Sequence, residues 1–202
     1  MSRFRGGSWR SFRPESASSQ QVALAPECRI LGLDPGSLRT GYGVIDCDRQ
    51  GERHRANGCI RATGTDLARR LRQIYDGVQA LITEHQPTEI AIERVFVHRN
   101  PDSALKLGQA RGVALCAATG LGASAHEYAP RAIKLAVSGY GAAAKDQVAQ
   151  MVTMLLKLSD QPGADAADAL AVALCHAQAR RLASLGAAVG SARRVVRGEA
   201  AR

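Results

Sequence analysis

The chain has 202 residues, of which 46% are hydrophobic and only 4% aromatic, and it carries a formal net charge of +9. This length is typical of one domain, and the composition predicts a globular core built from Leu, Ile, Val and Ala. No stretch of the sequence approaches the roughly 20 apolar residues of a membrane span, and the first residues lack the apolar run of a signal peptide. We therefore expect a soluble, cytoplasmic protein.

The positive charge is concentrated at the two ends of the chain. Residues 1–27 carry a net charge of +2 and residues 179–202 a net charge of +5. The Ser-, Arg- and Gly-rich start is typical of disorder. We therefore expect a disordered extension over residues 1–27, one ordered domain over 28–181 and a flexible basic tail over 182–202. Such tails suit a polyanionic partner, but they do not make the central domain a nucleic-acid binder.

The cysteines do not predict a disulfide framework or a zinc site. The chain has five of them, an odd number, and no C-x-x-C pair. Most stand inside apolar runs, where a reduced cysteine behaves as a small hydrophobic residue. This usage favours a reducing compartment.

The first part of the ordered domain predicts a β-meander. Cys28–Asp34 is a short apolar run stopped by Pro35 and Gly36, which indicates a buried strand that enters a turn. Gly41–Cys47 and Asn57–Thr63 have the composition of two further strands. Three such strands in succession favour antiparallel pairing.

Helices and strands alternate in the rest of the domain. Residues 66–85 place apolar side chains at helical spacing, with Asp66 as the N-cap. The other expected elements are strands at Glu89–Glu93 and Ser124–Tyr128 and helices at Ser103–Ala118, Lys145–Leu158 and about Asp165–Arg181. The order predicts an α/β fold with a mixed five-stranded sheet flanked by helices.

Four carboxylates stand where they suit a metal site. Asp34 and Glu93 each end a buried strand, and Asp165 and Asp168 lie three residues apart at the start of a helix, so they share one face. A carboxylate removed from water needs a donor or a cation nearby. Several carboxylates around one hard cation suit Mg²⁺.

Each of these acids also has an ordinary structural interpretation. Asp34 before Pro-Gly is a common turn residue, and Glu93 can pair with a neighbouring arginine. Asp165 can cap the helix, and Asp168 can interact favourably with the helix dipole. The sequence alone does not show that the four converge.

Four motifs carry a resemblance to a known family. The segments ILGLDPGSLRTGYGVI, AIERVF, DSALKLGQARGVAL and GADAADALAVALCHA closely resemble the RuvC Holliday-junction resolvases, in the same order and almost without gaps from about Cys28 to His176. The resemblance implies a ribonuclease H-like fold, a homodimer and paired incisions across a four-way DNA junction. It also implies cooperation with the RuvA–RuvB branch-migration complex.

The resemblance assigns the metal ligands and the chemistry. The family's metal-binding acids fall on Asp34, Glu93, Asp165 and Asp168, so all four are present. The implied mechanism is phosphodiester hydrolysis with two Mg²⁺ ions, for which Mn²⁺ can substitute.

The resemblance also implies where DNA binds. Lys134 and Lys145 match two basic family positions near the phosphates, and Phe96 matches an aromatic residue placed to stack on a base of an opened junction. Lys145 also begins a helix, whose N-terminus favours a phosphate. The competing interpretations are solvated lysines and a packing role for Phe96. Four other basic residues in or beside the motifs can add to the DNA-binding surface: Arg39, Arg94, Arg99 and Lys106.

The sequence departs from the family pattern at two positions. Arg94 follows the catalytic Glu, where Gln is common in the family, and Ala144 stands where related sequences can carry an acid. Helix Ser103–Ala118 is the expected dimer interface, because its small residues allow close approach, although they can equally pack the helix on the sheet. The alternatives are a non-catalytic DNA-binding module, a ribonuclease H-like nuclease with another substrate, and a sugar-kinase or actin-like ATPase. The sequence contains no G-x-x-x-x-G-K-[ST] phosphate loop, which disfavours the ATPase. Dependence of cleavage on a divalent metal separates the module from the enzymes.

Overall fold

The fold is organised around a mixed sheet. The computed structural model describes residues 27–94, 101–120 and 122–199, with side chains up to residue 187. The sheet has five strands in the order β3-β2-β1-β4-β5. The strands are β1 (Cys28–Asp34), β2 (Arg39–Asp48), β3 (Gly51–Arg61), β4 (Glu89–Glu93) and β5 (Ser124–Tyr128). The first three form an antiparallel meander, and β4 and β5 run parallel to β1, which confirms the expected mixed sheet.

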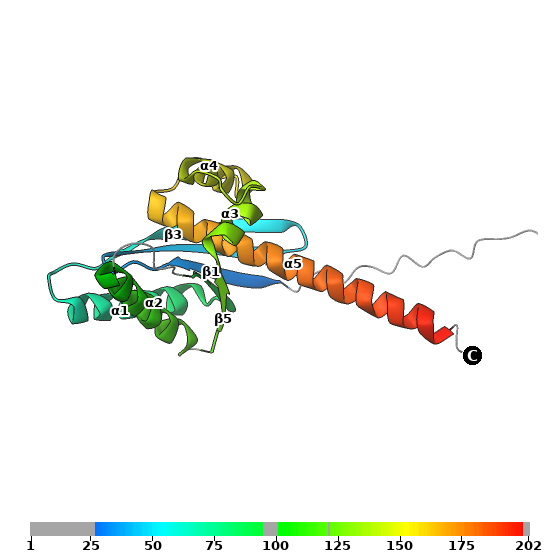
Figure 1. Cartoon of the computed structure of the whole chain (residues 1–202), viewed down its shortest axis with the longest axis horizontal. Coiled ribbons are helices and arrows are strands. Elements are labelled where there is room, and N and C mark those ends of the chain that lie inside the picture. Colours follow the sequence, from blue (N-terminus) through cyan, green and yellow to red (C-terminus); the bar gives the residue numbers. More distant parts are fainter. Residues whose placement is uncertain (1–26, 95–100, 121, 200–202) are drawn as a thin grey trace, which may run out of the picture.

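Helices cover both faces of this sheet (Figure 1). One face carries α1 (Leu67–His85) and α2 (Pro101–Thr119), and the other carries α3 (Pro130–Ser138), α4 (Lys145–Leu155) and α5 (Ala164–Glu199). In the part of the chain that the structure describes, we find no helix with the length and apolar character needed to cross a membrane.

The alternation of β4 decides which of its residues face which helices. Ile90 and Ile92 are fully buried in the core under α1 and α2, whereas Ala91 is buried in the core under α5. Because successive side chains of a strand point to opposite faces, Glu89 and Glu93 point to the same face as Ala91. Both glutamates of the segment EIAIE therefore face α5.

Glycines allow α5 to lie directly on the strands. A Cβ on Gly32 would collide with the backbone carbonyl oxygen of Ala169, and a Cβ on Gly41 would collide with that of Asp165. Side chains at these two positions would push the helix away from the sheet. The absence of those side chains sets how closely the residues of α5 approach β1 and β2.

Several element boundaries match the sequence prediction. Strands β1, β4 and β5 begin and end at the predicted residues. Asp66 caps α1, and its Oδ1 accepts a hydrogen bond from the Ala68 backbone N–H at 2.9 Å, as expected.

Other elements differ from the prediction. Helix α3 was missed because it has only nine residues, although Pro130 at its start and Gly139 in the left-handed conformation at its end are helix boundary signals. Strand β3 begins at Gly51 instead of Asn57, because the hairpin pairing continues from the two-residue turn into a polar edge strand.

The C-terminal helix is longer than predicted, and α4 is shorter. Helix α5 continues to Glu199 instead of ending near Arg181, since its Ala-rich sequence contains no proline. Helix α4 ends at Leu155 instead of Leu158, just before Lys157 takes a positive φ of 51°. The expected disorder of the N-terminal extension concerns residues that lie outside the described part, and the flexibility of the basic tail stays a prediction.

Candidate active site

Two carboxylate side chains lie at the C-terminal ends of neighbouring strands and point to the same face of the sheet. Asp34 ends β1 and Glu93 ends the neighbouring parallel strand β4, with Leu33 opposite Ile92 in the register. Leu33 and Ile92 both pack in the core under α1 and α2. The next residue on each strand consequently points towards α5.

The first turns of α5 bring the other two carboxylates to this edge. A pocket of about 130 Å³ is lined by Asp34, Glu93 and Asp168. Asp165 does not line the pocket, but it is close enough for its charge to act on the carboxyl of Asp34. The four acids predicted from the sequence therefore lie together, and we call Asp34, Glu93, Asp165 and Asp168 the acid cluster.

Burial and mutual repulsion disfavour the charged forms of two of these acids. Burial is the largest cause that raises the pKa of Asp34 to about 7, followed by the charges of Glu93 and Asp168, while Lys145 opposes the shift. The pKa of Glu93 is raised by burial first and then by Asp168, with Lys145 and Lys134 opposing. A cation at this position would relieve both effects.

The protein neutralises only part of the acid cluster. Arg39 Nε lies 2.6 Å from Asp165 Oδ2, and Lys145 Nζ lies 2.9 Å from Asp168 Oδ2. Among the described residues, no ion pair involves Asp34 or Glu93. A set of oxygen donors with uncompensated charge fits a hard divalent cation.

Two predicted DNA-binding lysines line the same pocket. Lys145 is the first residue of α4, and Lys134 lies on α3, where its Nζ donates to the Ala143 carbonyl oxygen at 2.7 Å. Both cations therefore stand beside the acid cluster. The missed helix α3 is what places Lys134 there.

The other predicted DNA-binding residues lie elsewhere or outside the described part. Arg94 is exposed and its Nε lies 3.4 Å from Glu127 Oε2, so its charge has a partner away from the acid cluster. Lys106 pairs with Asp102 on α2 at 2.6 Å. The predicted roles of Phe96 and Arg99 concern residues outside the described ranges.

Arg39 was treated in the sequence only as part of a basic surface. In the structure it begins β2 and forms the ion pair with Asp165. The available signal was the short connection from Asp34 through Pro35 and Gly36, which returns the chain to the same edge of the sheet. The hairpin therefore supplies a counter-charge to an acid that lies 126 residues away.

Comparison with known proteins gives one consistent result. The family described as crossover junction endodeoxyribonuclease RuvC matches residues 30–176. A relative of that name from Chromohalobacter salexigens is 56% identical over 156 residues, which covers 77% of this chain and 84% of the relative. Another, from Pseudoalteromonas atlantica, is 53% identical over 169 residues and covers 84% of this chain and 96% of the relative.

The fold has a solved counterpart as well. The structure of Thermus thermophilus RuvC in complex with Holliday junction substrate matches with a TM-score of 0.72 and 32% identity, covering 78% of this chain and 97% of that chain. The family match over residues 30–176 includes all four residues of the acid cluster and the sheet from Ile30 of β1 onward. The chain belongs to the RuvC family of crossover junction endodeoxyribonucleases.

Proposed function

We propose that this chain is a structure-selective endonuclease that resolves Holliday junctions in recombination and DNA repair by paired symmetric phosphodiester hydrolysis. The observation that carries the proposal is the acid cluster, in which β1, β4 and α5 direct carboxylates to one pocket without full neutralisation. Family membership supplies the substrate class, since the relatives are named crossover junction endodeoxyribonucleases.

The proposed cofactor is Mg²⁺, two ions per active site, with Mn²⁺ as a substitute. Oxygen donors alone suit these hard ions, and Asp34, Glu93, Asp165 and Asp168 are the proposed ligands. Bound in this way, the ions would lower the pKa of a water molecule and stabilise charge on the scissile phosphate. The chain contributes the spacing of the ligands, because two of them are fixed by neighbouring strands and two by one helix.

The proposed DNA contacts surround this pocket. Lys134 and Lys145 offer positive charge beside the acid cluster, and the N-terminus of α4 adds a favourable dipole for a phosphate. Phe96 stays a proposed stacking residue, and Arg94, Arg99 and Lys106 stay proposed contributors to the basic surface.

A homodimer is the proposed assembly, with α2 at the interface. A Cβ on Gly108 or Gly112 would meet no atom within 4 Å, and Leu105 is 63% exposed, so this side of α2 is open to a second copy. Ala110, in contrast, is fully buried against the sheet side of the helix. A symmetric dimer would offer one active site to each of two opposed strands. Cooperation with the RuvA–RuvB complex and a cytoplasmic location belong to the same proposal.

Cleavage of a synthetic mobile four-way junction tests this function. The full chain is incubated with the junction and with a linear duplex of the same sequence, in Mg²⁺, in Mn²⁺ and in chelator. We expect paired symmetric nicks in the junction alone, lost with chelator. Equal cutting of the duplex would indicate a nuclease with a different substrate, and junction binding without cleavage across varied core sequences would indicate a binding module.

The variant Asp34→Asn tests the site assignment. We expect it to abolish cleavage and to leave junction affinity nearly unchanged, because it removes a metal ligand and no positive surface. Asp76→Asn, on the exposed side of α1, is the matched control for loss of one carboxylate. A loss of binding as large as the loss of cleavage would overturn the assignment.

A further inference from the structure

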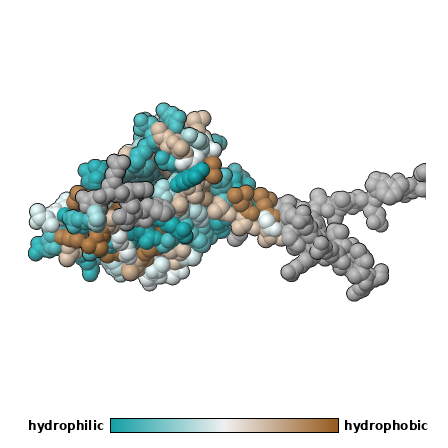
Figure 2. Space-filling model, viewed as in Figure 1, coloured by the Kyte–Doolittle hydropathy of each residue, from teal (hydrophilic) through white to brown (hydrophobic). Residues whose placement is uncertain are grey.

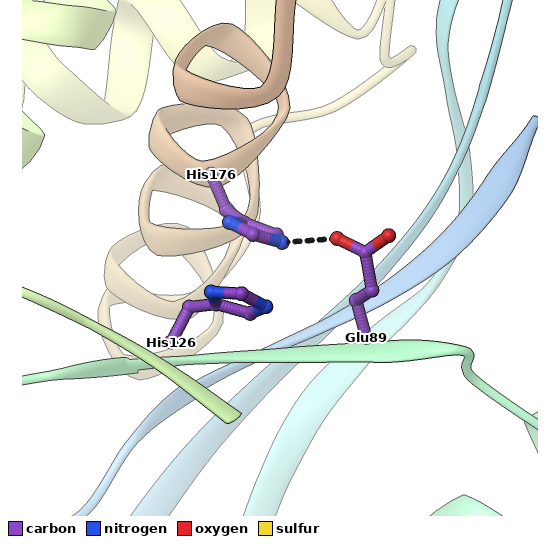
Figure 3. Close-up of side chains that lie close together, drawn as sticks. All are labelled: Glu89, His126 and His176. Atoms are coloured by element: carbon purple, nitrogen blue, oxygen red, sulfur yellow. Dashed lines mark hydrogen bonds and ion pairs between the residues drawn. The ribbon is translucent and has the colours of Figure 1, made fainter. Parts of the chain in front are cut away.

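A second group of possible metal ligands lies at the opposite end of β4 from Glu93. It consists of Glu89, the first residue of β4, with His126 of β5 and His176 of α5 (Figure 3). One ligand atom from each residue lies within 4.8 Å of the others. We call these three residues the histidine cluster.

The distance between the two clusters is similar along β4 and along α5. Glu89 and Glu93 are four residues apart on a strand, which is about 13 Å. Asp168 and His176 are eight residues apart on a helix, which is about 12 Å. The packing of β4 against α5 thus brings a glutamate to the helix at each end of the strand. The histidine cluster is therefore separate from the pocket at the acid cluster.

The donor set differs in kind from the acid cluster. Two imidazoles and one carboxylate are the ligands that Zn²⁺ and Co²⁺ accept, whereas Mg²⁺ prefers oxygen ligands alone. His176 is only 2% exposed, and burial lowers the pKa of its ring, although the hydrogen bond to Glu89 opposes this shift. Neutral imidazole is the form that binds a metal.

Surrounding side chains hold this group in place. Tyr128 Oη lies 2.6 Å from His176 Nδ1, and Glu89 Oε2 lies 2.6 Å from His176 Nε2 and 2.8 Å from Arg180 Nε. Because a carboxylate only accepts, His176 Nε2 carries the proton and Nδ1 accepts from the tyrosine hydroxyl. Partners of this kind orient metal-binding histidines in proteins.

We propose that Glu89, His126 and His176 form a second metal site, which binds one divalent transition ion such as Zn²⁺. On binding, the His176 proton moves from Nε2 to Nδ1, where it is donated to the Tyr128 hydroxyl oxygen, and Nε2 becomes the ligand. The His126 ring now stacks on His176 with centroids 4.3 Å apart, so this partly exposed side chain must rotate to direct a nitrogen at the ion. The ion would then join β4, β5 and α5.

Metal titration of the full chain tests the proposal without an activity readout. The protein is stripped with chelator and titrated with Zn²⁺ by calorimetry in excess Mg²⁺, which occupies the acid cluster, and Co²⁺ binding is followed by visible absorption. We expect one equivalent of each ion to bind, with nitrogen-ligated Co²⁺ bands and a melting temperature raised by Zn²⁺.

Three variants assign the ligands. His126→Phe keeps a stacked ring but removes a ligand, and Glu89→Gln removes the carboxylate. Each should weaken Zn²⁺ binding at least as much as the loss of an outer-shell partner does, which is roughly 10–100-fold. Asp168→Asn should bind Zn²⁺ as the parent does, because its change lies in the acid cluster. Unchanged affinity in His126→Phe and Glu89→Gln, or no Zn²⁺ binding by the parent chain, would overturn the proposal.

A competing thiol site is tested in the same way. Cys28 and Cys47 are opposite each other on β1 and β2, and thiols also bind Zn²⁺. Cys28→Ser should leave the Zn²⁺ affinity unchanged. A loss of binding in Cys28→Ser with full binding in His126→Phe would assign the ion to the cysteines and overturn the proposal.

Discussion

The two ends of the β4–α5 pair compensate their glutamates differently. Glu89 accepts from His176 at 2.6 Å and from Arg180 at 2.8 Å, so its charge has donors from two side chains. Glu93 has no ion-pair partner among the described residues, and burial together with Asp168 raises the pKa of its carboxyl. Glu89 and Glu93 thus point to the same face of β4, but in the described part of the chain only the charge of Glu89 is compensated by an ion pair.

This difference distinguishes the proposed Mg²⁺ site, where a cation would compensate the charge of Glu93, from the proposed second metal site, where protein side chains already compensate the charge of Glu89. An uncompensated buried carboxylate destabilises the metal-free fold, and a fold retains it where the charge has another use. In the histidine cluster, His176 is hydrogen-bonded to Glu89 before any ion binds (Figure 3), and His126 stacks on the His176 ring. The visible face of the molecule mixes hydrophilic and hydrophobic residues (Figure 2). The distinction between the two glutamates lies in their local contacts.

The largest expected effect is on cleavage by Glu93→Gln. The substitution keeps the size of the side chain but removes the charge of a proposed metal ligand. We therefore expect junction cleavage to fall by a thousandfold or more, about 4 kcal/mol of transition-state stabilisation. Single-turnover cleavage of the four-way junction in Mg²⁺ measures the change.

Asp76→Asn is the control, since it removes the same charge from the other face of the sheet. Cleavage by Glu93→Gln within tenfold of the parent chain would remove Glu93 from the set of ligands.

The next effect is a gain of metal-free stability in Asp34→Asn. The ordinary pKa of an aspartate carboxyl is 3.8, and the folded protein raises the pKa of Asp34 to about 7, so the folded state binds its proton more tightly. Stability from this group is complete below about pH 4 and is lost as the pH rises through 7. In chelator at pH 8, Asp34→Asn should therefore be more stable than the parent, by at most about 4 kcal/mol.

Urea unfolding of both proteins at pH 4 and pH 8 measures this difference. The gain should vanish at pH 4, and added Mg²⁺ at pH 8 should stabilise the parent and not the variant. The same difference in stability at both pH values would mean that the folded protein does not raise the pKa of the Asp34 carboxyl.

The sequence predicted the acid cluster better than it predicted the rest of the site. Asp34 and Glu93 could be located because a strand ends there, and β1 and β4 have uninterrupted apolar runs that are easily delimited. Asp165 and Asp168 could be located because a helix begins there. The resemblance of the motifs then indicated that the four converge, which spacing alone did not.

The histidine cluster shows what local patterns do not reveal. Glu89 and His176 are 87 residues apart, and strand alternation and helical spacing place each on a face without pairing them. Their contact depends on how closely α5 lies on the sheet, which is decided by backbone contacts at Gly32 and Gly41. Helix α3 was missed for a different reason, because nine residues carry too little periodicity to stand out.

A smaller loss of stability is expected from Gly32→Ala, which should move α5 and with it residues of both clusters. The new Cβ would collide with the backbone of Ala169 and lie 2.9 Å from the Cβ of Ala173, between the two ends of the contact. Backbone atoms cannot turn away, so α5 must shift, and we expect a loss of about 3 kcal/mol in stability. Urea unfolding measures the loss, with Gly186→Ala as a control at an unobstructed position of α5. A loss below about 1 kcal/mol would show that the spacing between α5 and β1 is adjustable.

The smallest expected effect gives the most direct comparison, because substitutions of two glutamates on one strand should change the stability in opposite directions. In chelator at pH 8, Glu93→Gln should stabilise the fold, since it removes a carboxylate whose pKa is raised by burial and by Asp168. Glu89→Gln should destabilise it by about 2 kcal/mol, since Arg180, which is only 14% exposed, loses the charge of the Glu89 carboxylate. Both variants keep the shape of the side chain, so urea midpoints compare the two environments directly. If both glutamines shifted the midpoint in the same direction, local compensation could not be what distinguishes the two ends. Opposite shifts would establish that the surroundings favour the charge of Glu89 and disfavour the charge of Glu93.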